Sequence, residues 1–477
     1  MHPAACPQGG VEDEAWTPNA TTMHKLSMST LIKKLHLPAS RPGEYMKHTK
    51  NLPKDSAILG MESPLHELSL LSAASAGDET VVNLLLDTGA NINEKDITSG
   101  KTPLALAVEK GHKATVTLLI DSGANLECKD HLSRTPLFYA RHPTIAQLLL
   151  NEGADVEPRD MNGRTPLSVA AEFGNEEIAR LLLDHGVNPT SKDLLNWTPL
   201  SWAFEKNHTD LVKLLLQNGA DPEQQDTFGR TLLLVAAETK REAMADILIT
   251  QGCNCEVHDH ENRTPLLWAA HNEHEDMAKL LIRNNANLEA RDENGRTALL
   301  LASEARHIAM AQVLVHAGAL LDVQDEYGRT PLLWSVQYGE EESIRLLLEK
   351  GACLEVEDGK YGRTALAWAA RRNDVSVVRV LLEFGADIEA EDYSGQTPLS
   401  VAARAGNVEV VKLLLERGAC VEVEDCYGRT PAQWASRGGY MAITRLLGGL
   451  GVGRDRDRDD RGEMGGIASR MAVASNS

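Results

Sequence analysis

The sequence of 477 residues predicts an all-α solenoid built from tandem helix–turn–helix units. Three observations predict this fold class. A Thr-Pro-Leu motif recurs along most of the chain, usually every 33 residues. A Leu-rich triplet follows 16 residues after the Thr position, and a Gly stands three residues beyond the triplet. A fixed period of this length is typical of repeat proteins, because each unit buries its apolar face only by stacking against its neighbours.

The repeated Thr is predicted to begin the first helix of each unit. Its hydroxyl can accept a hydrogen bond from the backbone of the first turn, and Pro at the next position costs the helix no hydrogen bond. Eleven units show this Thr: Thr102, Thr135, Thr165, Thr198, Thr231, Thr264, Thr297, Thr330, Thr364, Thr397 and Thr430. An earlier unit is centred on Ala73 and Ala74, so we count twelve units, the last of which ends near Gly451.

The fourth unit illustrates the elements that follow this Thr. Residues 166–173 are predicted to form a short inner helix, and residues 176–185 a second helix with a buried Leu row. Gly186 ends the second helix, because glycine readily adopts the left-handed conformation of a helix terminus. The residues between this Gly and the next Thr are predicted to form an extended hairpin turn.

Two units depart from this pattern. The third is about three residues short between Ala140 and Ile145 and contains Pro143, so we expect a defect in the stack there. The tenth unit follows a one-residue insertion near Lys360, which is expected to fall in the turn.

Residues 63–451 resemble ankyrin repeats in the Thr-Pro-Leu motif, the Leu triplet and the closing Gly. The His that follows Thr-Pro-Leu in that family is absent, and Ala105, Phe138, Ser168 and Leu267 stand in its place. The resemblance implies a curved superhelical rod whose partners contact the hairpin turns and the ends of the inner helices. Twelve units stacked about 10 Å apart would give a rod on the order of 100–120 Å long.

Shifts in composition divide the chain into three parts. Residues 1–62 are predicted to be a mostly disordered basic arm, because they contain several Pro, an excess of Lys and Arg, and no repeat. Residues 63–451 form the predicted solenoid of about twelve units. Residues 452–477 are predicted to be a disordered tail, in which Arg and Asp alternate between Arg454 and Asp459.

Charge and composition exclude several classes of function. The net charge of −21 repels phosphate backbones, so nucleic acid is not expected as a partner. No apolar run reaches the ~18 residues of a membrane span, so no membrane association is expected. Seven cysteines are too few for a disulfide framework and their number is odd, which predicts free thiols in a reducing compartment. With no apolar leader near the N-terminus, the predicted location is the cytoplasm or the nucleus.

No motif of an enzyme, a cofactor site or a metal site stands out in the sequence. Gly100-Lys101-Thr102 imitates the end of a phosphate-binding loop, but Lys95 stands where that loop needs a Gly. One cluster has the side chains that zinc prefers, but its members occupy repeat positions: Cys253, Cys255, His258 and His260. We therefore predict a non-enzymatic protein without a cofactor or a metal.

Five Trp residues occupy one repeat position, four residues after the Thr: Trp202, Trp268, Trp334, Trp368 and Trp434. Such a row could line a binding groove. The favoured interpretation is a packing position between neighbouring inner helices, because Tyr139, Val169, Val235 and Leu301 fill it elsewhere. A further row, which includes Arg164, directly precedes the Thr. Its regular occurrence with an Asp five residues before the Thr suggests turn structure rather than partner contact.

The candidate partner-binding residues lie late in the chain. The inner-helix ends carry Glu in earlier units, at Glu109, Glu172, Glu205, Glu238 and Glu304, and change to Tyr or Arg in the last four units. With the Tyr residues of the adjoining turns they form the predicted site: Tyr327, Tyr338, Tyr361, Arg371, Arg372, Tyr393, Arg404, Tyr427 and Arg437. Tyr and Arg are enriched among the residues that dominate binding energies at interfaces. We expect an acidic protein segment to bind here, across units nine to twelve.

The predicted function is a non-enzymatic protein–protein interaction scaffold or adaptor, which binds a partner on the concave face and the hairpin turns. The alternative is a regulatory or sensor array that acts as a component of a larger signalling or ubiquitin-ligase machine. A pull-down that returns a single machine component would favour the alternative.

Overall fold

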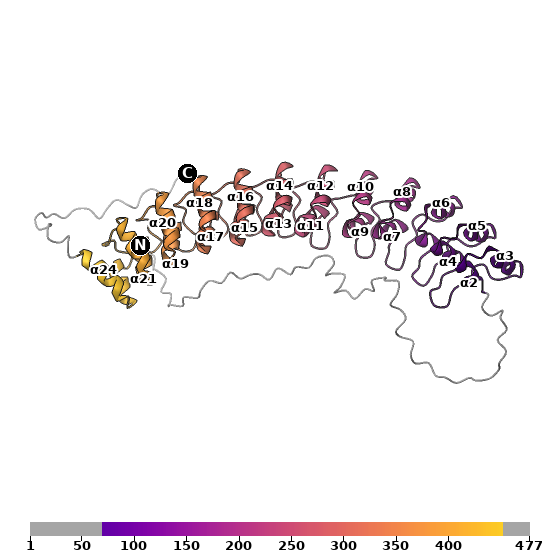
Figure 1. Ribbon diagram of the computed structural model, residues 1–477, viewed down its shortest axis with the longest axis horizontal. Helices are drawn as coiled ribbons and strands as arrows, with labels where there is room; N and C mark the ends of the chain where they lie inside the picture. The colour runs from indigo at the N-terminus through magenta and orange to yellow at the C-terminus, as the bar shows by residue number, and fades with distance from the viewer. Residues whose placement is uncertain (1–68, 452–477) are drawn as a thin grey trace, which may run out of the picture. The chain divides into compact units, whose positions relative to one another are not determined.

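The computed structural model describes residues 69–451, and in this range every regular element is a helix. The helices form twelve consecutive pairs, in agreement with the twelve units counted in the sequence. We call the first helix of each pair the inner helix and the second the outer helix. Figure 1 shows them as two rows, with α9, α11, α13 and α15 below α10, α12, α14 and α16. The predicted arm 1–62, residues 63–68 and the predicted tail 452–477 lie outside the described residues.

The inner helices are short, and from the second unit onward each begins directly after the repeated Thr. In chain order they are α2 (Leu70–Ala76), α4 (Pro103–Lys110), η2 (Pro136–Tyr139), α7 (Pro166–Phe173), α9 (Pro199–Glu205), α11 (Leu232–Thr239), α13 (Pro265–His271), α15 (Ala298–Ala305), α17 (Pro331–Tyr338), α19 (Ala365–Arg372), α21 (Pro398–Ala405) and α23 (Pro431–Arg437). The predicted cap is confirmed in most units. The backbone N–H of Ser168, for example, donates to the Thr165 hydroxyl over 3.3 Å.

The outer helices follow after a tight turn. They are α3 (Glu79–Asp87), α5 (Lys113–Asp121), α6 (Pro143–Asn151), α8 (Glu176–Asp184), α10 (Thr209–Gln217), α12 (Glu242–Thr250), α14 (Glu275–Arg283), α16 (Ile308–His316), α18 (Glu341–Glu349), α20 (Val375–Glu383), α22 (Val408–Glu416) and α24 (Met441–Gly451). Gly186 (φ 81°) follows α8 in the left-handed conformation, as predicted, and Asn285 (φ 62°) adopts the same conformation after α14.

The core lies between the two rows and continues from unit to unit. The middle residue of the Leu triplet is fully buried in successive outer helices, as Leu182, Leu215 and Leu248 show. Small residues of the inner helices, such as Ala171 and Ala203, are also fully buried and allow the helices to pack closely. Because each unit supplies only part of this core, burial depends on both neighbours.

The third unit has the predicted defect. Its inner element is a single 3-10 turn, η2, and Ala140 continues as extended backbone. The Thr135 hydroxyl forms no capping hydrogen bond and is buried without a partner. The chain then enters α6 directly at Pro143. The missing residues have therefore removed the second half of the inner helix.

The hairpin turns are joined to one another by single backbone hydrogen bonds. The N–H of Met161 donates to the carbonyl of Leu132 over 2.9 Å, and the N–H of Tyr393 donates to the carbonyl of Tyr361 over 2.9 Å. Between residues 69 and 451, one junction lacks this bond: the turns that precede units five and six. The side chain of Gln224 donates to the carbonyl of Asn196 over 3.1 Å there instead.

A second line of bonds runs beside the ends of the outer helices. In most units a carboxylate accepts a hydrogen bond from a backbone N–H of the following unit. Glu256 accepts from Asn287 over 2.8 Å, and Glu389 accepts from Cys420 over 2.7 Å. These carboxylates couple each unit to the next one in the chain.

Candidate interaction surface

The ends of the inner helices and the turns form one surface, which we call the inner face. On it, a cation just before the repeated Thr faces the residue eight positions later in the inner helix. In four earlier units that residue is Glu, and the two form an ion pair: Lys101–Glu109 (2.8 Å), Arg164–Glu172 (2.9 Å), Arg230–Glu238 (2.6 Å) and Arg296–Glu304 (2.8 Å). Glu205 pairs with Arg241 of the next unit over 3.4 Å. The Glu row of the sequence is therefore largely neutralised within the molecule.

The same pair of positions changes composition in units nine to twelve. The pairs there are Arg329–Gln337, Arg363–Arg371, Gln396–Arg404 and Arg429–Arg437. These positions are filled by Arg and Gln and include no acid. Only a neutral acceptor remains, since Arg329 donates to the side-chain oxygen of Gln337 over 2.8 Å. These paired positions thus carry an excess of positive charge in units nine to twelve, in a chain of net charge −21.

The predicted Arg residues lie on this part of the inner face. All four predicted arginines are exposed. Arg371 and Arg372 stand at the end of α19, Arg404 at the end of α21 and Arg437 at the end of α23. Within residues 69–451, Arg372, Arg404 and Arg437 form no ion pair. The guanidinium of Arg404 lies 4.7 Å from the ring centroid of Trp434 in the next unit. That contact holds the side chain in place and leaves its charge accessible.

Four of the predicted Tyr residues are exposed at the turns beside these Arg residues. Tyr327 is 52% exposed, Tyr361 37%, Tyr393 64% and Tyr427 49%. The ring of Tyr393 packs over Gly362 of the preceding turn so closely that a Cβ added at Gly362 would collide with it. The four rings are therefore exposed at successive turns, and that of Tyr393 rests directly on the turn before it.

Two of these Tyr residues rest on an arginine that itself lies against a tryptophan. The guanidinium carbon of Arg363 is 4.5 Å from the ring centroid of Tyr361 and 5.4 Å from that of Trp368. In unit twelve, Arg429 lies 5.1 Å from Tyr427 and 4.7 Å from Trp434. Such stacking restrains the rings before any ligand binds.

Tyr338 differs from the other predicted Tyr residues. It is half-buried, stacks on Trp334 with ring centroids 5.9 Å apart, and packs against the core of Leu300 and Val323. Burial raises the pKa of its hydroxyl. Tyr338 therefore mainly supports the inner face, with little of its ring available to a partner.

The Trp row is tied to the turns by hydrogen bonds. In each of the five units the indole Nε1–H donates to a buried turn aspartate: Trp202 to Asp193, Trp268 to Asp259, Trp334 to Asp325, Trp368 to Asp358 and Trp434 to Asp425, over 2.7–3.0 Å. The packing interpretation of this row is confirmed. The Arg row is also part of the turns, because its backbone N–H groups donate to the same aspartates, as Arg329 does to Asp325 over 2.8 Å.

The sequence reasoning missed the first half of an apolar row along the turn tips. Ile97 is 93% exposed and Leu194 77%, and Leu132 and Met161 are exposed as well. These side chains occupy turn positions close to those of the Tyr residues. They stand three to five positions before their Thr and not at one fixed repeat position, so such aliphatic residues do not stand out from ordinary sequence variation.

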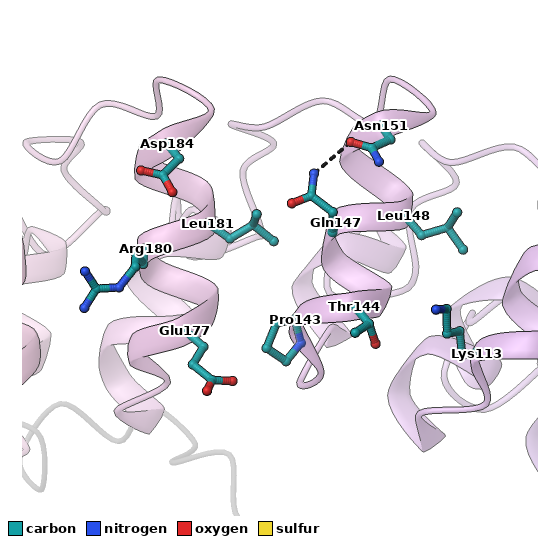
Figure 2. Close-up of a pocket in the computed structure, with 10 residues that line it drawn as sticks. All are labelled: Lys113, Pro143, Thr144, Gln147, Leu148, Asn151, Glu177, Arg180, Leu181 and Asp184. Atoms are coloured by element: carbon teal, nitrogen blue, oxygen red, sulfur yellow. Dashed lines mark hydrogen bonds between the residues drawn. The ribbon is translucent and has the colours of Figure 1, made fainter.

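A shallow groove of about 560 Å³ lies away from this surface, on the outer helices of units two to four. Figure 2 shows that its lining comes from α6 and α8, with Lys113 of α5 at one side. Gln147 and Asn151 hydrogen-bond to each other over 2.7 Å along its wall. The groove is open, and Arg180, which lines it, forms an ion pair with Glu176 over 2.5 Å.

The Cys-His cluster is dispersed around one turn. Cys253 is buried, and burial raises the pKa of its thiol to about 12, which makes it a poor nucleophile at neutral pH. Within residues 69–451 no three His, Cys, Asp or Glu side chains come together as a metal site. None of the helices in this range is long and apolar enough to cross a lipid bilayer.

Fold and surface together define a helical repeat protein of the protein–protein interaction class. The chain matches the family model described as ankyrin repeats (3 copies) over residues 70–160, 141–226, 232–325, 317–392 and 385–455. These matches span more than half of the chain, which therefore belongs to the ankyrin-repeat family. Proteins of this family are generally non-enzymatic interaction modules.

No curated protein sequence matches the chain. Among solved structures it is similar to the crystal structure of the ankyrin repeat domain of Bcl-3, described as a unique member of the IkappaB protein family. The two share 29% sequence identity, and the match covers 46% of this chain and 99% of that chain with a TM-score of 0.43.

Proposed function

We propose that this protein is an interaction scaffold or adaptor that binds an acidic segment of a protein partner on the inner face of units nine to twelve. The observation that carries the proposal is the change of charge along the inner face. Four earlier units neutralise the cation before the repeated Thr with Glu, whereas units ten to twelve carry Arg371, Arg404 and Arg437 at the position of that Glu.

The two residue types of the site have different roles. The Arg residues attract an acidic segment and confine it to this end, because the acidic remainder of the molecule repels it. Exposed ion pairs contribute little to affinity, so the Tyr residues supply most of it. A Tyr that acts as a true anchor contributes about 2 kcal/mol or more.

The proposal can be tested with the full chain and a blocked hexaglutamate peptide, whose binding is followed by fluorescence anisotropy at low salt. The double variant Arg404→Glu/Arg437→Glu should weaken binding at least about tenfold and reduce its salt dependence. Tyr427→Ala should also weaken binding, with a smaller effect on the salt dependence.

Arg180→Glu is the matched control, because Arg180 is an exposed arginine on the outer helix α8, away from the inner face. It should leave the affinity unchanged. The control changes the net charge by −2 and the double variant changes it by −4. A control that loses half as much binding free energy as the double variant would therefore show that only net charge matters. Full binding by the double variant would refute the proposed location.

A further inference from the structure

The guanidinium of Arg363 lies beneath the proposed surface and has a donor without an acceptor. Arg363 is only 5% exposed. Its backbone N–H donates to Asp358 over 3.2 Å, and its Nε lies 3.4 Å from Oδ2 of Asp392. Its Nη1 is fully buried and has no hydrogen-bond partner. Leaving a charged donor buried without an acceptor is costly, so the surroundings of Nη1 favour an added acceptor.

Units four, six, eight and nine supply this acceptor from the residue eight positions later. In each of these units the Nη1 of the turn arginine donates to that residue. The pairs are Arg164 to Glu172 (2.9 Å), Arg230 to Glu238 (2.6 Å), Arg296 to Glu304 (2.8 Å) and Arg329 to Gln337 (2.8 Å). In the tenth unit that residue is Arg371. Burial is the main cause that lowers the pKa of Arg363, and the positive charge of Arg371 lowers it further, because both disfavour the charged form of Arg363.

We infer that the buried Nη1 of Arg363, together with Arg371, forms a binding subsite for one carboxylate, which a Glu or Asp side chain of the partner supplies in place of the missing intramolecular Glu. This inference rests on the proposed function and names the anchoring point of the acidic segment. The carboxylate accepts a hydrogen bond from Nη1 and lies between two guanidinium groups, where it restores the ion pair that units four, six and eight form internally.

Access to the subsite requires movement of Tyr361. Its ring centroid lies 4.5 Å from the guanidinium carbon of Arg363, and the ring meets Trp368 edge to face, with centroids 6.0 Å apart. Because Tyr361 stands on a turn and is partly exposed, rotation of its side chain can uncover the guanidinium without unfolding a helix. Binding of a carboxylate should therefore change the environment of the neighbouring Trp368 indole.

The decisive variant is Arg371→Glu in the full chain. It places a carboxylate at the position that Glu172, Glu238 and Glu304 hold in other units. We expect it to raise the midpoint of thermal unfolding by about 2 °C or more, and to weaken hexaglutamate binding at least about tenfold. The matched control is Arg404→Glu, which makes the same charge change opposite Gln396 and should weaken binding without raising the midpoint.

A second measurement reports on the occupancy of the subsite itself. Hexaglutamate should shift the Trp368 indole N–H resonance in the wild-type chain, assigned with Trp368→Phe, whereas hexaglutamine should not. If Arg371→Glu, like Arg404→Glu, does not raise the midpoint, or if Trp368 does not respond to bound hexaglutamate, the subsite is refuted while the proposed function stands. If hexaglutamate does not bind the wild-type chain at all, both are refuted.

Discussion

In eight of the units the buried aspartate of the turn has one of two alternative side-chain partners. Where a Trp occupies the repeat position, the indole N–H donates to it, as Trp334 does to Asp325 over 3.0 Å. Where Val or Leu occupies that position, the turn arginine binds the aspartate instead: Arg164–Asp160 (3.1 Å), Arg230–Asp226 (2.8 Å) and Arg296–Asp292 (2.7 Å). The aspartate thus has a hydrogen-bonding partner in both cases. The residue four positions after the Thr determines whether that partner is the indole or the turn arginine.

This exchange predicts an energetic coupling between Trp334 and Arg329. Trp334→Leu copies the eighth unit, where Leu301 occupies the position, so Arg329 should turn to Asp325 and compensate for the lost indole. Arg329→Lys should therefore cost about 1 kcal/mol more in the Trp334→Leu background than in the wild type, because Lys cannot reproduce the arginine's contacts. Urea unfolding of the four proteins measures this coupling, and equal costs in both backgrounds would contradict it.

The sequence predicted the packing role of the Trp row and the turn role of the Arg row. It did not show that both rows share one aspartate. That contact joins residues that are nine positions apart and belong to different local structures, a turn and a helix, so no periodicity within either element reveals it. The buried donor of Arg363 was missed for the same reason, since it depends on what stands eight residues away.

At the scale of elements, the shortened third unit is the main interruption of the stack. The inner element η2 provides one turn of helix where its neighbours provide two, and residues 140–142 are not helical. The length and position of this defect followed from the sequence. The form it takes, a 3-10 turn with a short extended link into α6 at Pro143, required the structure.

Limited trypsin digestion of the full chain should cut after Arg141 before it cuts at any site in units five to eleven. Arg141 is exposed and lies in the non-helical link between η2 and α6, where little structure must open to admit a protease. Mass spectrometry of the early fragments identifies the site. First cleavage within the solenoid between Thr198 and Glu416 would contradict this expectation.

The junction between units five and six is a second irregular element, which the sequence did not indicate. The backbone bond between neighbouring turns is replaced there by the side chain of Gln224. The turn before unit five also carries Asn196 and Trp197 where most other turns carry Gly and Arg. Trp197 lies against Trp202 at a tilt of 56°, with ring centroids 4.7 Å apart, and so takes over the space that the arginine fills elsewhere.

Stability of the whole solenoid is distributed, because each unit is held mainly by its two neighbours. The last unit has a neighbour on one side only within the described residues. Its inner helix α23 buries Pro431 and Ala435 rather than a full apolar face. Gly448 and Gly449 weaken α24 further, by about 1 kcal/mol each relative to Ala.

We therefore expect the last unit to open first. In hydrogen exchange on the full chain, amides of residues 430–451 should exchange well before those of the seventh unit, around Thr264. The seventh unit has neighbours on both sides and buries most of its inner helix α13. Equal protection of the two units would contradict a one-dimensional distribution of stability.

At this scale the sequence predicted most of the fold. The number of units, their helices and their caps follow from the repeat, because each motif residue has a local structural reason. The sequence predicted the exposure of the candidate site residues less completely. Tyr393 and Arg404 lie exposed on the inner face as expected, but Tyr338 is half-buried, because its stacking on Trp334 is a contact that spacing alone does not specify.

The carboxylates that accept from the following unit bear on how such a chain changes length in evolution. Each copy of the unit brings one acceptor for the copy after it and one donor for the copy before it, as Glu256 and Asn287 illustrate. A tandem duplication of one whole unit therefore creates a new junction that already satisfies both groups. Insertions of part of a unit break the pairing, so selection should favour gain and loss of repeats in whole copies.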